Sequence, residues 1–170
     1  MDGAAAAMRI ERDIMVRARD GIGLAADLYR PEGSGPFPVI LERTPYDKSA
    51  PSRSERTAAV AAPRSRAEVA AYFVAHGYAV AYQDCRGRYR SEGRFTKYLS
   101  EAEDGYDTLA WLVRQPWCNG RVATMGLSYG AHAQMALGCL DPPGWPPNSS
   151  IAAASPMPIA AASATAAPSI

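Results

Sequence analysis

The chain has 170 residues, 48% of them hydrophobic, and carries 18 Lys and Arg against 17 Asp and Glu. This length suits one domain with a substantial core, and the balanced charge gives no electrostatic basis for binding nucleic acid or an anionic membrane. Three cysteines without metal-ligand spacing indicate free thiols in a reducing compartment. The sequence contains no apolar run of about 20 residues, so no membrane span is predicted. Residues 1–8 are expected to form a flexible leader rather than a signal peptide. The sequence therefore predicts a cytoplasmic protein.

The N-terminal part of the chain shows short strand patterns separated by turn residues. Alternating apolar residues predict a strand over 8–18, and the turn Arg19-Asp20-Gly21 joins it to a second strand over 22–29 as a hairpin. An apolar run predicts a third strand over 37–42. Residues 49–65 are rich in Ser, Arg, Pro and Ala, so this segment is expected to be exposed with little fixed structure.

Helical and strand patterns alternate along the rest of the chain. Apolar residues at helical spacing predict helices over 67–76 and 101–115, and apolar runs predict strands over 78–83 and 121–125. Gly77 is placed to end the first of these helices. Such alternation implies parallel strands joined by crossover helices, so the predicted fold class is α/β.

The most informative motif is Gly126-Leu-Ser-Tyr-Gly130, which lies between the last predicted strand and a predicted helix over 131–140. This is the G-x-S-x-G pattern in a strand–turn–helix context, where a serine occupies a strained turn and exposes its hydroxyl. Glycines are expected there because side chains would crowd the neighbouring strand and helix. The motif favours Ser128 as a nucleophile. The alternative is an ordinary strand-to-helix turn with a capping serine.

Polar residues follow the ends of three predicted strands: Tyr46, Asp84 and Ser128. Ligands of parallel α/β sheets bind at the carboxyl ends of the strands, so this edge is the expected active face. Four arginines come just after Asp84: Arg86, Arg88, Arg90 and Arg94. They are interpreted as a polar loop, with a site for an anionic ligand as the alternative.

Four segments of the chain resemble the cocaine esterase/X-Pro dipeptidyl-peptidase-like (CocE/NonD) branch of the α/β-hydrolases. They follow the family order within residues 9–144: RDGIGLAADLYRP, RTPYDK, YAVAYQDCRGRYRSEG and EDGYDTLAWLVRQPWCNGRVATMGLSYG. The resemblance implies the N-terminal half of the α/β-hydrolase fold, a hairpin plus a mostly parallel sheet up to the nucleophile elbow. It also implies a serine hydrolase for small esters, amides or short X-Pro peptides, with no cofactor and no metal.

The resemblance further implies roles for individual residues. Ser128 matches the nucleophile, Tyr46 an oxyanion-hole donor through its phenol O–H, and Tyr129 a second donor through its backbone N–H. A tyrosine hydroxyl can donate a hydrogen bond, although the residues alone favour a packing role for Tyr46. Asp84 and Arg86 match a D-x-R-G turn, interpreted as structural, with a local ion pair.

A serine hydroxyl needs a base, and in α/β-hydrolases the acid and the histidine follow the serine along the chain. After Ser128 this chain has one histidine, His132, and one carboxylate, Asp141. His132 is expected on the surface or core-facing side of the elbow helix and Asp141 at the end of that helix, while His76 lies at the end of an earlier helix. The sequence therefore predicts neither the triad acid nor the triad base in this chain.

Residues 145–170 are rich in Pro, Ala and Ser, contain no charged residue and show no helical or strand period. Such a tail is expected to be disordered. A GC-rich back-translation with one base restored after the Gly144 codon gives a family-like continuation, which motivates the hypothesis of a frame-shifted tail. Three interpretations remain open: a serine hydrolase, a catalytically inactive fragment of one, and a half-domain that needs a complementing chain.

Overall fold

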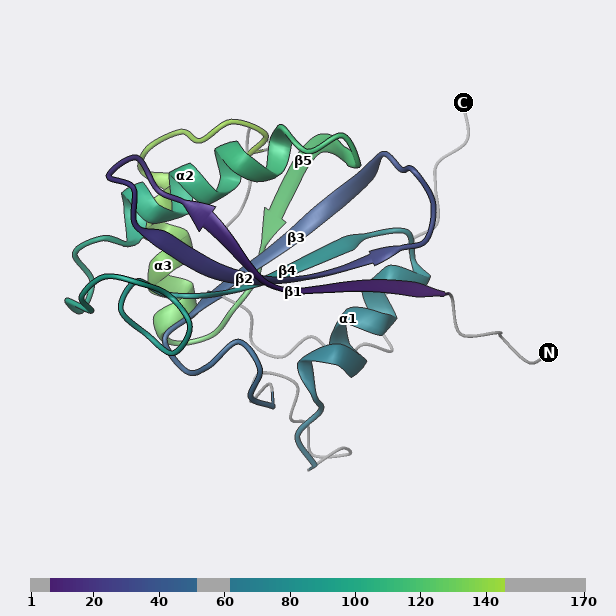
Figure 1. The fold of residues 1–170 in the computed structure, drawn as a ribbon, viewed down its shortest axis with the longest axis horizontal. Coiled ribbons are helices and arrows are strands. Elements are labelled where there is room, and N and C mark those ends of the chain that lie inside the picture. The colour runs from purple at the N-terminus through teal and green to yellow at the C-terminus, as the bar shows by residue number, and fades with distance from the viewer. Residues whose placement is uncertain (1–6, 52–61, 146–170) are drawn as a thin grey trace.

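The computed structural model describes residues 7–51 and 62–145, which form one sheet of five strands with three helices (Figure 1). The elements in chain order are β1 (Met8–Arg17), β2 (Gly23–Pro31), β3 (Phe37–Thr44), α1 (Arg66–Ala75), β4 (Ala79–Asp84), α2 (Glu101–Val113), β5 (Cys118–Thr124) and α3 (Tyr129–Gly138). The expected tail and most of the segment expected to be exposed lie outside the described residues. Within the described part of the chain, no helix combines the length and apolarity needed to cross a membrane.

The strand order of the sheet is β1-β2-β4-β3-β5. β1 and β2 form the predicted antiparallel hairpin, and the Gly21 N–H donates to the Ala18 carbonyl in the turn between them. β2 is also antiparallel to β4, whereas β3 is parallel to both β4 and β5. The α/β class is therefore confirmed, with the parallel strands at the β5 side and the hairpin at the other edge.

Helices cover both faces of the sheet (Figure 1). α1 packs on one face, where its Ala70 and Val74 meet Tyr29, Val80 and Tyr82 of the strands. α2 and α3 cover the opposite face, and a larger apolar core lies beneath them: Leu28, Val39, Leu41, Ala79, Ala81, Leu109, Leu112, Trp117, Val122 and Leu137. Successive strand residues alternate between the two cores, as the pleat of a strand requires.

Among the element boundaries that differ from the sequence prediction, two belong to the elements on either side of the serine turn. β5 begins at Cys118 rather than at residue 121, because a register irregularity opposite Phe37 and Val39 absorbs Gly120, whose φ is +81°. α3 begins at Tyr129 rather than at residue 131, so the helix starts directly after the serine of the elbow.

α1 begins with a capping box. Its N-cap Ser65 accepts from the Glu68 N–H, and the Glu68 carboxylate accepts from the Ser65 N–H. Gly77 follows the end of the helix with a φ of +83°, as predicted for a stop signal.

Candidate active site

The turn between β5 and α3 holds Ser128 in a strained backbone conformation. Its φ is 55° and its ψ is −114°, a combination that non-glycine residues rarely adopt. The Ser128 carbonyl accepts from the His132 N–H at 3.2 Å, and this hydrogen bond starts the helix. The Ser128 side chain makes no capping hydrogen bond. The alternative of a capping serine is therefore wrong, and the hydroxyl is not engaged with the helix that follows it.

The two glycines of the motif contribute differently. Gly126 has a φ of +136°, and a Cβ built there would lie 3.2 Å from the Cα of Gly130. A Cβ on Gly130 would lie 3.5 Å from the Arg43 carbonyl oxygen, an ordinary van der Waals contact. The expected crowding is confirmed for Gly126, whereas Gly130 has room for a methyl group.

Ser128 and Tyr46 line the same cavity, whose volume is about 610 Å³. Tyr46 follows β3, its backbone N–H donates to Thr44 Oγ1 at 3.1 Å, and the residue is 56% exposed. Leu127 and Gly130 of the elbow contribute to the wall, and Tyr89 closes it from the loop after β4. The cavity therefore lies at the carboxyl ends of the parallel strands, the edge predicted from the sequence.

Tyr129 is the first residue of α3, so its backbone N–H is among the donors that have no acceptor within the helix. The positive end of the helix dipole adds to the attraction of this N–H for a developing negative charge. The side chain leads away from the cavity, because its hydroxyl donates to Glu101 at 2.8 Å and accepts from the Tyr98 N–H at 3.0 Å. Burial raises the pKa of the Tyr129 phenol, which keeps the hydroxyl protonated as a donor.

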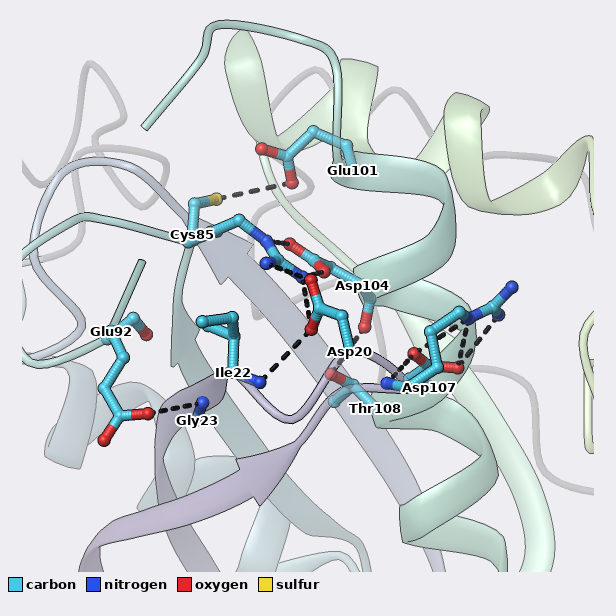
Figure 2. A network of polar contacts seen from close by, with 12 residues as sticks. Asp20, Ile22, Gly23, Cys85, Glu92, Glu101, Asp104, Asp107 and Thr108 are labelled. Atoms are coloured by element: carbon cyan, nitrogen blue, oxygen red, sulfur yellow. Dashed lines mark hydrogen bonds and ion pairs between the residues drawn. The ribbon is translucent and has the colours of Figure 1, made fainter. Parts of the chain in front are cut away.

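Asp84 and Arg86 have a structural role, but the predicted local ion pair between them is wrong. The Asp84 carboxylate is fully buried and accepts from the backbone N–H groups of Lys48 at 2.8 Å and Arg90 at 3.2 Å. Burial raises the pKa of this carboxyl. The Arg86 guanidinium instead pairs with Asp104 of α2 and with Asp20 of the hairpin turn. These two carboxylates lie close together in Figure 2. Asp84 thus shapes the loop beside the cavity without lining the cavity itself.

None of the residues considered as a catalytic base lines the cavity with Ser128. His132 lies on α3 with its ring centroid 4.2 Å from that of Tyr98, and its buried Nε2 has no hydrogen-bond partner among the described residues. His76 is exposed at the end of α1, where Nδ1 lies 2.7 Å from the Tyr72 carbonyl oxygen. Asp141 is exposed beyond α3. Within residues 7–51 and 62–145 there is also no cluster of side chains suited to holding a metal ion.

Sequence reasoning missed a buried ion pair in the cavity wall. Arg66 Nη1 lies 3.0 Å from Glu42 Oε1, and both side chains are more than nine-tenths buried. The Arg66 guanidinium also lies over the Tyr82 ring, 5.0 Å from its centroid. The signal available in the sequence was a charge at position 42, inside the apolar run of β3.

A second buried cation holds the loop that follows Tyr46. Lys48 Nζ lies 2.6 Å from Asp27 Oδ1 and 2.7 Å from Asp13 Oδ1. Burial by itself would lower the pKa of Lys48, but the bonds to the two carboxylates outweigh it and raise the pKa. The side chain and the backbone of Lys48, which donates to Asp84, therefore fix this loop to β2 and to the end of β4.

A mixed sheet with helices on both faces and a strained strand–serine–helix turn at the end of a parallel strand define the class of the α/β-hydrolases. A comparison with family models refines this class. Residues 20–159 match the model of the X-Pro dipeptidyl-peptidase (S15) family, and the chain belongs to that family.

Individual relatives agree with this assignment. The chain is 42% identical over 120 residues to a cocaine esterase of Rhodococcus sp. (strain MB1 Bresler), an alignment that covers 71% of this chain and 19% of that esterase. Among solved structures, a CocE/NonD family hydrolase from Staphylococcus aureus superposes with a TM-score of 0.68 at 28% identity, over 79% of this chain and 26% of that one. An α-amino acid ester hydrolase superposes with a TM-score of 0.63 at 31% identity, over 82% and 25%. The chain thus spans about a fifth to a quarter of the length of these relatives.

Proposed function

We propose that this chain carries the nucleophile and the oxyanion hole of a serine hydrolase that cleaves small esters, amides or short X-Pro peptides. The observation that carries the proposal is the strained Ser128 at the end of β5, in the same cavity as the exposed Tyr46. A strained backbone at a serine flanked by Gly126 and Gly130 is the geometry that presents a nucleophile. The relatives named cocaine esterase and α-amino acid ester hydrolase support an ester substrate.

In the proposed reaction, Ser128 Oγ attacks the substrate carbonyl carbon and transfers its proton to a general base. The carbonyl oxygen becomes an oxyanion that accepts hydrogen bonds from the Tyr46 hydroxyl and the Tyr129 N–H. Collapse of the tetrahedral intermediate expels the alcohol or amine, which takes up the proton held by the base, and leaves an acyl group on Ser128. Water then removes this acyl group as the free acid. Each oxyanion donor is expected to contribute about 10²- to 10³-fold to the rate.

The general base and its orienting acid are proposed to come from residues other than those described. The supporting observation is that none of the histidines among the described residues lines the cavity. Two alternatives follow for the 170-residue chain itself: it is catalytically inactive, or it becomes active when another polypeptide supplies the base. Loss of triad members leaves serine hydrolases slower by about 10⁴- to 10⁶-fold.

The test is labelling of the purified chain with a fluorophosphonate, beside a Ser128→Ala control, together with hydrolysis of an activated phenyl ester. Because phosphonylation of Ser128 also needs a base, the expected result is slow labelling that depends on Ser128, together with ester turnover reduced by about 10⁴-fold or more relative to a typical esterase. Labelling that persists in Ser128→Ala would overturn the nucleophile. Turnover at ordinary enzyme rates would instead show that a base is present in this chain.

A further inference from the structure

One buried carboxylate, that of Glu101, contacts three segments of the active-site edge. Glu101 is the first residue of α2, and its side chain is 3% exposed. Its Oε1 accepts from the Tyr129 hydroxyl at 2.8 Å, and its Oε2 lies 2.8 Å from Arg43 Nη1. The Cys85 thiol points at the same carboxylate with its sulfur 3.5 Å from Oε2 (Figure 2). The carboxylate therefore joins the end of β3, the residue after β4 and the start of α3.

These contacts tie together the backbone segments that carry the two oxyanion donors. Arg43 lies in β3 three residues before Tyr46, and it also donates from Nη1 to the Glu101 backbone carbonyl at 2.8 Å. Tyr129 is both the first residue of α3 and the partner of Glu101 Oε1. Because both residues bond to one rigidly held carboxylate, the separation between β3 and the N-terminus of α3 is fixed through Glu101.

The ring of Tyr129 has further contacts that leave it a single orientation. Its hydroxyl accepts from the Tyr98 N–H at 3.0 Å, and the two rings stack with centroids 5.0 Å apart and planes 19° apart. A side chain held at its tip and along its face also holds its own backbone. A buried hydrogen-bond network of this kind is stiff because each lost partner leaves a polar group unpaired in a low-dielectric interior.

We propose that Glu101 is a positioning residue of the oxyanion hole, which sets the Tyr129 N–H relative to the Tyr46 hydroxyl by bonding Tyr129 and Arg43 together. This inference rests on the proposed function. Glu101 does not line the cavity, so it acts through Tyr129 and Arg43 and not on the substrate. A displacement of about 1 Å at a catalytic donor can cost on the order of 10²-fold in rate, so a partial loosening is expected to cost roughly tenfold.

The test uses two mild variants and a matched control in the full chain. Glu101→Gln keeps the shape of the side chain and an oxygen for the Tyr129 hydroxyl but removes the charge that faces Arg43. Tyr129→Phe removes the hydroxyl and keeps both the backbone N–H and the Arg43–Glu101 pair. Ser91→Ala is the control, since its buried hydroxyl also makes two hydrogen bonds, donating to the Asp84 carbonyl and accepting from the Ala25 N–H, and neither bond involves Glu101 or Tyr129.

The first readout is the concentration dependence of fluorophosphonate labelling, which separates kinact from KI. Glu101→Gln and Tyr129→Phe are expected to lower kinact roughly tenfold with KI unchanged, whereas Ser91→Ala leaves kinact unchanged. The second readout is the ¹H–¹⁵N resonance of the Tyr129 amide, which is expected to shift in Glu101→Gln and not in Ser91→Ala. In Tyr129→Phe the resonance of the Gly130 amide is followed instead, because the substitution itself alters the amide at position 129.

The two readouts separate the positioning role from the proposed function. If the wild-type chain is not labelled at Ser128, the proposed function fails, and the amide resonance still tests the positioning by Glu101. A folded Glu101→Gln variant with an unmoved Tyr129 amide, or an equal effect in Ser91→Ala, would overturn the inference. If Glu101→Gln does not fold, Tyr129→Phe decides, because it leaves the ion pair of Glu101 in place.

Discussion

Replacing Lys48 with methionine is expected to destabilise the protein by about 3 kcal/mol. Lys48 is 4% exposed in its side chain and lies 2.6 Å from Asp27, which is 1% exposed. Methionine keeps an unbranched side chain of similar reach but removes the ammonium group. The buried Asp27 carboxylate then loses its nearest cation, and this loss of charge compensation is the main source of the destabilisation.

The magnitude follows from the partners that Asp27 keeps. Removing one member of a buried ion pair costs about 3–5 kcal/mol. Asp27 still accepts from Arg12 Nη1 at 3.0 Å and from the Asp13 N–H at 3.0 Å, so the lower end of this range applies. Proteins of this size have free energies of unfolding of about 5–15 kcal/mol, so the variant is expected to lose a large fraction of its stability. The corresponding decrease in Tm is about 6–12 °C.

The assay is equilibrium urea unfolding followed by tryptophan fluorescence, applied to Lys48→Met, Asp27→Asn and the double variant. The double variant is expected to lose less than the sum of the two single losses, because it no longer buries an unpaired charge. A loss below about 1 kcal/mol in Lys48→Met, or strict additivity in the cycle, would refute the reasoning from buried charge.

Two further predictions concern the elbow and the charges near β1. Gly126→Ala is expected to lower the free energy of unfolding by about 1–3 kcal/mol because of the φ of +136°. Gly130→Ala, with an ordinary Cβ contact, is expected to leave the free energy of unfolding unchanged or to raise it by up to about 1 kcal/mol. Equal losses of stability in urea unfolding would contradict this. The hydrogen bond from Lys48 lowers the pKa of Asp13, so the ionised carboxylate stabilises the fold above an unfolded-state pKa of about 3.9, and this contribution disappears as pH falls through the folded-state pKa. Urea midpoints measured from pH 7 to pH 3 should therefore fall less steeply in Asp13→Asn than in the wild type, and parallel curves would count against the Asp13–Lys48 interaction.

The existence and order of the secondary structure elements were predictable because their signals are local. Alternation in β1, the turn at Gly21 and the helical spacing in α2 each depend on residues close together in the chain. The start of β5 was not predictable, because Gly120 has the character of a strand breaker and only the pairing with β3 accommodates it. The start of α1 was present in the sequence as the S-x-x-E signature of Ser65 and Glu68.

The candidate site was predictable to the extent that it depends on strand ends. Ser128 and Tyr46 meet in one cavity because each follows a strand of the same parallel pair. The ion pairs around the site were not predictable, since Arg86 does not pair with its sequence neighbour Asp84 but with Asp20 and Asp104, which are distant in the sequence. Such partners depend on how hairpin, loop and helix pack, which no local pattern in the sequence encodes.

The strand order of the sheet also has a consequence for the order of folding. The hairpin needs only a short loop closure, but β3 lies between β4 and β5, both of which follow it in the chain. Val39 pairs with Ala79 on one side and with Val122 on the other, so these contacts close much longer loops. Because long closures cost more chain entropy, the hairpin is expected to form early and the β3–β5 pairing late. Ser128 lies in the turn after β5, so its strained backbone conformation is expected to form only in the closing stage of folding, and a probe of that conformation would report on that stage.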